Sequence, residues 1–271
     1  MTSPTTHPPR WRRERRHRRA AGAHRGPALQ RAARGLLRRP VRRLWPLELS
    51  GFDTVPQVGA AILCANHLSF FDSVFLMMTL DRPVYFIGKA DYLDSWKTRR
   101  LFPAMGMIPI DRDNGARAMV ALDAAADVLR DGGLLCVFPE GSRSRDGRLH
   151  RGYSGAARLA MTVDCPILPV GITGTQDVQP PGARLPRPGR ACSIAIGDPM
   201  SAAPEDGPGR KMVARTLTDQ LMERIAALSG QDYVAQYTKR SGRGERTDRL
   251  PALRPRSIFG PFGSAPLALE T

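Results

Sequence analysis

The chain has 271 residues, of which 41 are Lys or Arg and 25 are Asp or Glu, so its formal net charge is +16. A hydrophobic fraction of 42% is enough for a sizeable core, which excludes a chain that is disordered throughout. The length fits one domain of ordinary size, with or without tails. The positive charge is compatible with a nucleic acid or an anionic membrane as partner, so its position along the chain has to be examined.

The positive charge is concentrated in two terminal segments. Residues 1–46 contain 14 Arg and one Glu, and residues 239–271 contain seven basic and three acidic residues. The segment between them has 20 basic and 21 acidic residues and is almost neutral. We therefore predict a globular domain over residues 47–238, with disordered basic tails at residues 1–27 and 239–271.

Residues 28–46 form a separate basic segment. Small and apolar residues recur there at helical spacing, with arginines between them: Leu29, Ala32, Ala33, Leu36 and Leu37. This pattern predicts a short basic amphipathic helix that ends before Pro40. Leu44, Trp45 and Leu47 follow, and are typical of a membrane interface. We interpret the segment as a membrane contact, and the alternative is that it packs on the domain.

The central segment alternates apolar β runs with helical stretches. The strands predicted are Ala61–Ala65, Val84–Gly88, Met107–Asp111, Leu134–Phe138, Ile167–Val170 and Ser193–Ile196. The helices predicted are Phe71–Leu80, Ala116–Arg130, Ser154–Val163 and Lys211–Leu228, and residues 176–190 are predicted as a loop. This alternation indicates an α/β fold with a mixed, mostly parallel sheet flanked by helices. No apolar run approaches the ~18 residues that a membrane-spanning helix needs.

The first informative motif, Asn66-His67-Leu68-Ser69-Phe70-Phe71-Asp72, follows directly on an apolar strand. His67 and Asp72 can meet if His67 lies in the turn after the strand and Asp72 in the first helical turn. A carboxylate beside a histidine fixes the imidazole tautomer and stabilises the imidazolium, which is the arrangement of a general base. The alternative is a loop histidine with Asp72 as a helix cap.

Three further motifs follow other predicted strands. Phe138-Pro139-Glu140-Gly141-Ser142-Arg143-Ser144-Arg145 brings a glycine and several anion donors to a strand end, where ligands of α/β sheets bind. Gly106-Met107-Ile108-Pro109-Ile110-Asp111-Arg112 ends in an arginine that can hold a phosphate. Ile167-Leu168-Pro169-Val170-Gly171 carries no polar side chain and is predicted to pack in the core, the alternative being a strand that lines an acyl chain. Each of the two polar motifs could also be a solvated turn or a surface ion pair.

These four motifs, in this order, resemble the four blocks of the glycerolipid acyltransferase superfamily, and most of all its bacterial 1-acylglycerol-3-phosphate acyltransferases. The resemblance extends from about Leu44 to Tyr237. It implies a glycerol-3-phosphate acyltransferase-like fold. It also implies that His67 is the general base for the acceptor hydroxyl and that Asp72 orients and stabilises His67.

The resemblance further implies a set of substrate-binding residues. Arg112, and with it Lys89, would bind the acceptor phosphate. Glu140 and Gly141 would shape the acceptor site, Ser142 and Arg143 would supply donors, and Asn66 would contact the substrate. Ser142 stands where Thr is frequent in the family, which keeps the hydroxyl group.

The expected reaction transfers a fatty acyl group from acyl-CoA or acyl carrier protein to the free hydroxyl of 1-acylglycerol-3-phosphate. The close alternative is another lysolipid or polar-lipid acceptor. Because a thioester is already activated, a base and an oxyanion stabiliser suffice, and we expect no cofactor and no metal. The expected partners are the lysophospholipid, the thioester donor and an anionic membrane surface. The expected location is cytoplasmic, peripheral on the inner face of the cell membrane.

A different class of function is an RNA-binding or membrane-binding protein whose basic tail is the functional part. Single-stranded nucleic acids are bound by aromatic residues interleaved with basic ones. Trp11 is the single Phe, Trp or Tyr in residues 1–43. We therefore expect no nucleic-acid partner.

Overall fold

The computed structural model describes residues 27–90, 96–110, 115–180, 183, 185–202, 207 and 209–238. Of the predicted disordered tails, residues 1–26 and 239–271 lie outside the described residues. Asp111 and Arg112, at the end of the second polar motif, lie outside them as well.

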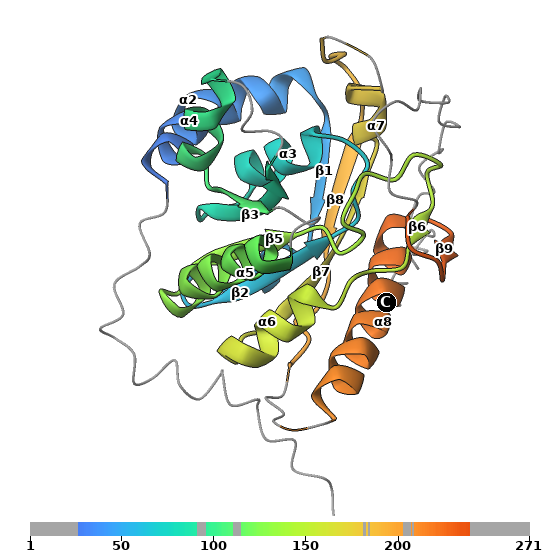
Figure 1. Ribbon diagram of the computed structural model, residues 1–271. Coiled ribbons are helices and arrows are strands. Elements are labelled where there is room, and N and C mark those ends of the chain that lie inside the picture. Colours follow the sequence, from blue (N-terminus) through green and yellow to red (C-terminus); the bar gives the residue numbers. More distant parts are fainter. Residues whose placement is uncertain are drawn as a thin grey trace, which may run out of the picture.

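The described residues form a seven-stranded sheet in the order β1-β8-β7-β2-β5-β3-β4 (Figure 1). All neighbouring strands are parallel except β7 and β8, which run antiparallel. The predicted fold class, a mixed and mostly parallel α/β sheet, is therefore confirmed. The strands are β1 (Leu47–Ser50), β2 (Ala61–Ala65), β3 (Val84–Lys89), β4 (Met107–Ile110), β5 (Leu134–Val137), β7 (Ile167–Thr173) and β8 (Cys192–Ile196).

Helices cover both faces of the sheet, so the fold has three layers (Figure 1). All five side chains of the central strand β2 are buried, and they point alternately into two cores. One core lies under α2 (Ala28–Leu44), α3 (Phe71–Thr79) and α7 (Thr175–Val178). The other lies under α5 (Gly115–Arg130), α6 (Gly155–Val163) and α8 (Arg210–Ser229). The short helices α4 (Trp96–Ala104) and η2 (Phe52–Thr54) complete the helical elements of the described residues.

A close approach between β7 and α8 depends on Gly171. A Cβ atom at this position would lie 2.5 Å from the carbonyl carbon of Leu228 and 2.6 Å from its Cβ. The absence of a side chain at Gly171 therefore allows the end of α8 to pack directly on the strand. This brings the residues after α8 back to the carboxyl end of β7.

The helix α2 differs from its prediction at Pro40. The helix continues through Pro40 to Leu44, whereas the sequence predicts an end before the proline. Val41 and Trp45, beyond the proline, are 9% and 7% exposed. Trp45 packs against Phe71 and Phe75, with ring centroids 5.6 and 5.7 Å apart. Burial of these two side chains compensates for the hydrogen bond that a proline cannot donate. Trp45 is thus a core residue, and its prediction as an interfacial residue is wrong.

A second, two-stranded sheet pairs β6 (Leu149–His150) with β9 (Tyr233–Val234). Two further backbone hydrogen bonds continue this contact, each 3.0 Å long: Leu149 N–H donates to the carbonyl of Asp232, and Arg151 N–H to that of Gln236. The segment that follows α8 is therefore held along the loop that follows β5.

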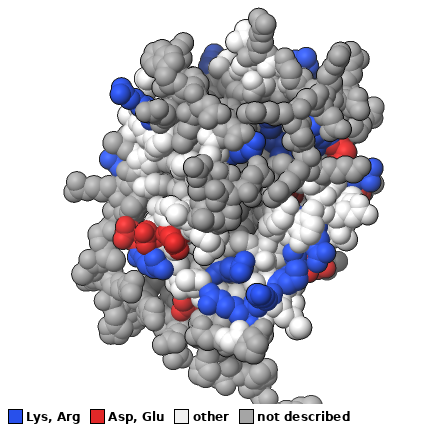
Figure 2. Space-filling view, viewed as in Figure 1, with Lys and Arg blue, Asp and Glu red and all other residues white. Residues whose placement is uncertain are grey.

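The charged side chains of the described domain carry both signs. Figure 2 shows Lys and Arg gathered over α6 and α8, with Asp and Glu on the same face. Within the described residues, no helix is both long enough and apolar enough to span a bilayer.

Candidate active site

The carboxyl ends of the parallel strands β2, β3, β4, β5 and β7 meet at one edge of the sheet, because neighbouring parallel strands end side by side. His67 follows β2, Glu140 follows β5 and Thr175 follows β7. Lys89 is the last residue of β3. The His67 motif and the motif that follows β5 are thus brought to one place by the topology, together with Lys89.

His67 and Asp72 form the centre of this site. The Nδ1 atom of His67 lies 2.8 Å from Oδ2 of Asp72, so the two side chains meet as predicted. The same carboxylate oxygen accepts hydrogen bonds from the backbone N–H groups of Leu68 (2.7 Å) and Ser69 (2.9 Å). The hydroxyl of Thr175 donates to the other oxygen, Oδ1. Asp72 is 0% exposed, and these four donors compensate for its burial.

The orientation of the His67 ring is fixed from two sides. The carboxylate at Nδ1 accepts a hydrogen bond, so Nδ1 carries the proton of the neutral imidazole and Nε2 keeps its lone pair. The ring stacks on Phe138, with centroids 3.9 Å apart and planes inclined by 16°. The side chain is 18% exposed. Within the described part of the chain, Nε2 has no hydrogen-bond partner. His67 is thus arranged to accept a proton at Nε2.

Glu140 is a buried carboxyl group beside this pair. Its Oε1 accepts a hydrogen bond from the backbone N–H of His67 (3.3 Å) and its Oε2 from that of His150 (2.9 Å). Burial raises the pKa of Glu140 to about 8, and the two N–H donors act in the opposite direction. The residue is 1% exposed, so it supports the backbone of the site and presents no oxygen to its surface.

Asn66 has another role than the substrate contact predicted for it. It is 0% exposed, and its amide pairs with both backbone groups of Ile172: Nδ2 donates to the carbonyl (2.8 Å) and Oδ1 accepts from the N–H (2.7 Å). The second Nδ2 proton goes to Oε1 of Gln231 (2.6 Å). All amide protons of Asn66 are therefore used inside the protein, and the residue fixes the turn that carries His67.

The loop after β5 presents the remaining predicted residues. Gly141 has a φ of +78°, a conformation that favours glycine, and its N–H donates to the Phe138 carbonyl (3.0 Å). Ser142 is exposed and its hydroxyl donates to Oγ1 of Thr238 (2.9 Å). Arg143 is exposed beside it. Lys89 is exposed at the end of β3. Arg112 lies outside the described residues, so its predicted phosphate contact stays a prediction.

Three residues of this site are not among the site residues predicted from the sequence. Thr175 lies 103 positions from Asp72, Gln231 lies 165 positions from Asn66, and Phe138 stacks on His67 from another strand. None of them falls in a spacing that local reasoning can detect. Thr175 has one local indication, because it follows directly on a strand that ends at the same edge as β2.

Part of this chain is similar in sequence to known acyltransferases. Residues 46–173 match the model of the Acyltransferase family. The chain is 33% identical, over 131 residues, to a "probable 1-acyl-sn-glycerol-3-phosphate acyltransferase" of Mycoplasma pneumoniae, a match that covers 45% of this chain and 47% of that protein. It is 34% identical, over 138 residues, to the 1-acyl-sn-glycerol-3-phosphate acyltransferase of Limnanthes douglasii, covering 48% and 46%. The chain thus spans about half the length of these curated relatives.

Among solved structures, the fold is similar to the crystal structure of the 1-acyl-sn-glycerophosphate (LPA) acyltransferase PlsC from Thermotoga maritima. The TM-score is 0.53 at 23% identity, and the match covers 72% of this chain and 82% of that chain. At this identity the likeness concerns the fold. The segment matched by the family model contains His67, Asp72 and Glu140, and it ends before Thr175 and Gln231.

Proposed function

We propose that this chain is an O-acyltransferase that acylates 1-acylglycerol-3-phosphate, because residues 46–173 match the model of the Acyltransferase family. The free hydroxyl of the acceptor attacks the carbonyl of an acyl thioester, the thiol leaves, and phosphatidic acid forms. The observation that carries the proposal is the His67–Asp72 pair, with Nε2 of His67 directed away from the carboxylate.

His67 is the general base in this proposal. Nε2 takes the proton of the acceptor hydroxyl as the oxygen attacks, and Asp72 stabilises the imidazolium that results. The proton then passes to the departing thiolate, so the reaction ends with His67 neutral. General-base catalysis of this kind contributes about 10²–10⁴-fold. The thioester, carried by CoA or by acyl carrier protein, is already activated, so the proposed step needs no metal and no cofactor.

We also propose that the site binds the phosphate of the acceptor. Lys89, Ser142 and Arg143 supply donors at the carboxyl edge. Arg112 follows β4 in the sequence, and we propose it as a further donor. Holding the phosphate places the hydroxyl at Nε2 and lowers the entropic part of the barrier. These donors recognise a phosphate and do not select among phosphate-bearing lysolipids.

The test is an acyl-transfer assay with labelled acyl-CoA and, separately, labelled acyl carrier protein. Both donors are offered to a panel of lysophosphatidate, other lysophospholipids and lysolipids without phosphate. We expect the fastest transfer to lysophosphatidate, and a loss of about 10²–10⁴-fold in kcat in His67→Ala. The matched control is His150→Ala, which removes an imidazole that bonds to Asp146 and keeps His67.

Two results would contradict the proposal. Unchanged transfer by His67→Ala would remove His67 as the general base. Faster transfer to a lysolipid without phosphate would keep the reaction and remove lysophosphatidate as the acceptor.

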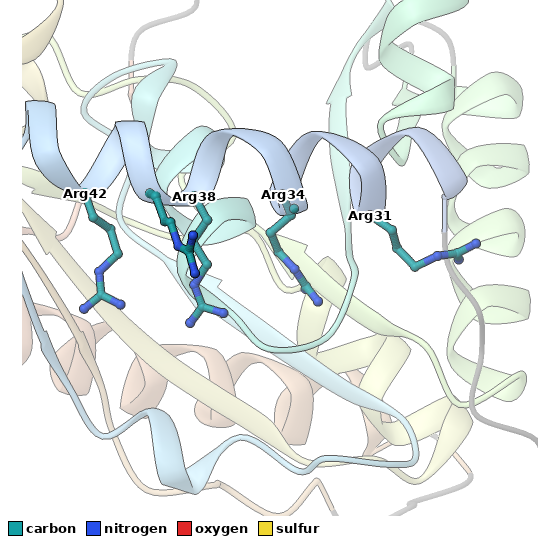
Figure 3. A pocket seen from close by; sticks show the side chains of 6 residues that line it. Arg31, Arg34, Arg38 and Arg42 are labelled. Carbon is teal, nitrogen blue, oxygen red and sulfur yellow. The ribbon is translucent and has the colours of Figure 1, made fainter.

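We further propose that α2 contacts an anionic membrane, peripherally and on its cytoplasmic face. Four leucines on α2 are 42–76% exposed: Leu29, Leu36, Leu37 and Leu44. Arg31, Arg34, Arg38 and Arg42 project from another side of the helix and line a hollow of about 650 Å³ (Figure 3). Arg34 donates to the carbonyls of Leu80 and Asp81, and this contact ties α2 to the domain. Exposed leucines beside arginines fit the interface of an anionic bilayer.

Deletion of residues 1–45 is a poor test of this contact, because Val41 and Trp45 belong to the core. The sharper test is Leu36→Asp in the full chain, since Leu36 is 76% exposed. Its control is Val58→Asp, at an apolar residue that is 62% exposed and lies outside α2, shortly before β2. We expect Leu36→Asp alone to weaken sedimentation with phosphatidylglycerol vesicles. Equal binding of both variants would refute the contact.

A further inference from the structure

We propose that Gln231 is a positioning residue of the active site, acting on His67 through Asn66. It lies outside the segment matched by the family model, which ends at residue 173, and follows the last helix of the described domain. The catalytic consequence rests on the proposed function above. The structural consequence, a change in the His67–Asp72 hydrogen bond, can be measured without it.

The side chain of Gln231 joins two separate parts of the site. Its Oε1 accepts a hydrogen bond from Nδ2 of Asn66 (2.6 Å), and its Nε2 donates to the carbonyl of Gly147 (2.7 Å). Gln231 is 6% exposed, and Asn66 and Gly147 are buried. Since water does not reach these groups freely, the loss of the Gln231 amide leaves a donor and an acceptor without partners.

Both ends of this bridge lead to the backbone of His67. Asn66 directly precedes His67, and its amide also pairs with both backbone groups of Ile172. Gly147 ends the loop whose Ser144 N–H donates to the carbonyl of His67 (2.7 Å). Gln231 therefore fixes the distance between Asn66, which precedes His67, and the loop that follows β5.

The position of Gln231 is itself determined by neighbouring contacts. Gln231 follows the end of α8, and the next residue, Asp232, accepts a hydrogen bond from the Leu149 N–H (3.0 Å). Further along, Thr238 donates to the carbonyl of Glu140 (3.3 Å). The segment is thus held along the loop after β5 on both sides of Gln231, which gives its amide little freedom.

The principal variant is Gln231→Met, which keeps the length of the side chain and removes both hydrogen bonds. A displacement of about 1 Å in a catalytic group costs about 10²-fold in rate. We therefore expect kcat to fall about 10- to 100-fold while KM for the acceptor changes little, because no residue proposed to hold the phosphate is touched.

The direct readout is the downfield proton resonance of His67 Nδ1–H bonded to Asp72, assigned by its absence in His67→Ala. We expect this resonance to weaken or exchange faster in Gln231→Met. Two glutamines provide controls. Gln30→Met removes a buried amide that bonds to Val84 and Met105, far along the sheet, and should leave the resonance intact. Gln220→Met, on the exposed face of α8, should leave both the resonance and kcat intact.

A second variant tests the hydrogen bonds by pH. In Gln231→Glu the neutral carboxyl can accept from Asn66 and donate to Gly147, whereas the carboxylate can only accept. The ratio of variant to wild-type kcat should therefore rise as the pH falls. If Gln231→Met does not fold, the pH dependence of this kcat ratio tests the proposal instead. A ratio that is independent of pH would refute the role of Gln231 as a positioning residue.

The outcomes separate the two proposals. If the wild type transfers no acyl group to any acceptor, the proposed function fails, and the His67 resonance still decides on Gln231. If the wild type is active and Gln231→Met keeps its kcat and the resonance, Gln231 is not a positioning residue. If Gln231→Met loses stability but kcat per folded molecule is unchanged, the bridge serves stability alone and the inference is wrong.

Discussion

Four hydrogen-bond donors converge on the buried carboxylate of Asp72, and only one of them is His67. The carboxylate thus fixes the turn of Leu68 and Ser69 as well as the imidazole. Replacement by an amide keeps the shape but turns an N–H group toward at least one donor. We expect Asp72→Asn to lower kcat by about 10²–10⁴-fold, because His67 loses its tautomer and its stabilised imidazolium.

The measurement is kcat and KM for the acceptor in the wild type and in Asp72→Asn. Asp219→Asn is the control, because Asp219 is a partly exposed aspartate on α8 that pairs with Arg215. A variant at Asp72 with raised KM and unchanged kcat would contradict the role assigned to the carboxylate.

The hydroxyl of Thr175 is the remaining partner of Asp72, and it is fully buried. In Thr175→Val the Oδ1 atom of Asp72 loses its donor, and an unpaired buried acceptor costs about 1–3 kcal/mol. Thr175→Ser keeps the hydroxyl and should retain most of the stability. Urea unfolding of the three proteins checks this, and a loss of stability in Thr175→Ser without one in Thr175→Val would mean that the methyl group matters instead.

Glu140 makes the stability of the fold depend on pH. Its pKa is raised to about 8 in the folded protein, above its ordinary value near 4.5, so the folded state holds this proton more tightly than the unfolded state. The stabilisation is complete below about pH 4.5 and is lost as the pH rises through about 8. We expect the free energy of unfolding of the wild type to fall over this window by a few kcal/mol more than that of Glu140→Gln.

Chemical denaturation at several pH values between these limits measures this difference. Parallel curves for the wild type and Glu140→Gln would show that the carboxyl is ionised throughout in the folded protein.

At the level of residues, the sequence alone predicts the pairing of His67 and Asp72, because both lie in one short motif with a strand before it and a helix after it. The sequence alone does not predict the role of Asn66, because its partners Ile172 and Gln231 lie far along the chain. The residue type is compatible with a substrate contact or a backbone contact, and burial decides between them. Thr175 and Gln231 are invisible to local patterns for the same reason.

At the level of elements, the apolar runs that become β2, β5 and β7 are predictable because both faces of these strands are buried. The edge strand β1 alternates between half-buried and exposed residues and is short, so its pattern is weak. The helix α7 begins at Thr175 and overlaps the start of the Pro-rich segment 176–190 that is predicted as a loop, and only Gly174 before it marks a turn. Pro40 misled the prediction of α2 because the tertiary burial of Val41 and Trp45 outweighs local propensity.

Two glycines in different elements give opposite predictions. In Gly171→Ala the new Cβ would meet Leu228 at 2.5 Å, so β7 or α8 has to shift, and we expect a loss of about 1–3 kcal/mol. In Gly35→Ala the new Cβ meets nothing within 4 Å, and alanine favours the helix α2, so we expect a gain of up to about 1 kcal/mol. Thermal unfolding of both variants checks the signs, and a stabilised Gly171→Ala would contradict the close packing.

At the level of the whole molecule, the division of charge is a property of the sequence, and the fold class follows from the alternation of strands and helices. The positive charge lies mostly at residues 1–46 and 239–271, most of which lie outside the described residues. The described domain carries both signs on the face shown in Figure 2. Residues 231–238 return to the edge of the sheet where β2 and β5 end. The order of the elements does not predict this return, because it depends on how α8 packs.

The proposed membrane contact should depend on the salt concentration. Arginine attraction to an anionic surface is screened by salt, over about 10 Å at 0.1 M and about 3 Å at 1 M, whereas burial of leucines is not. We expect sedimentation with phosphatidylglycerol vesicles to weaken with added salt and to retain a fraction that Leu36→Asp abolishes. Binding that is unaffected by salt would exclude the arginines from the contact.

The contacts of the segment after α8 also determine when the site is completed during synthesis of the chain. Synthesis begins at the amino terminus, and His67, Asp72 and Glu140 leave the ribosome well before Gln231 and Thr238. The strands β2, β5 and β7 can pair while these last contacts are still missing, because they depend on residues that have yet to emerge. A nascent chain therefore holds the His67–Asp72 pair in an unfinished site until residues 231–238 have emerged.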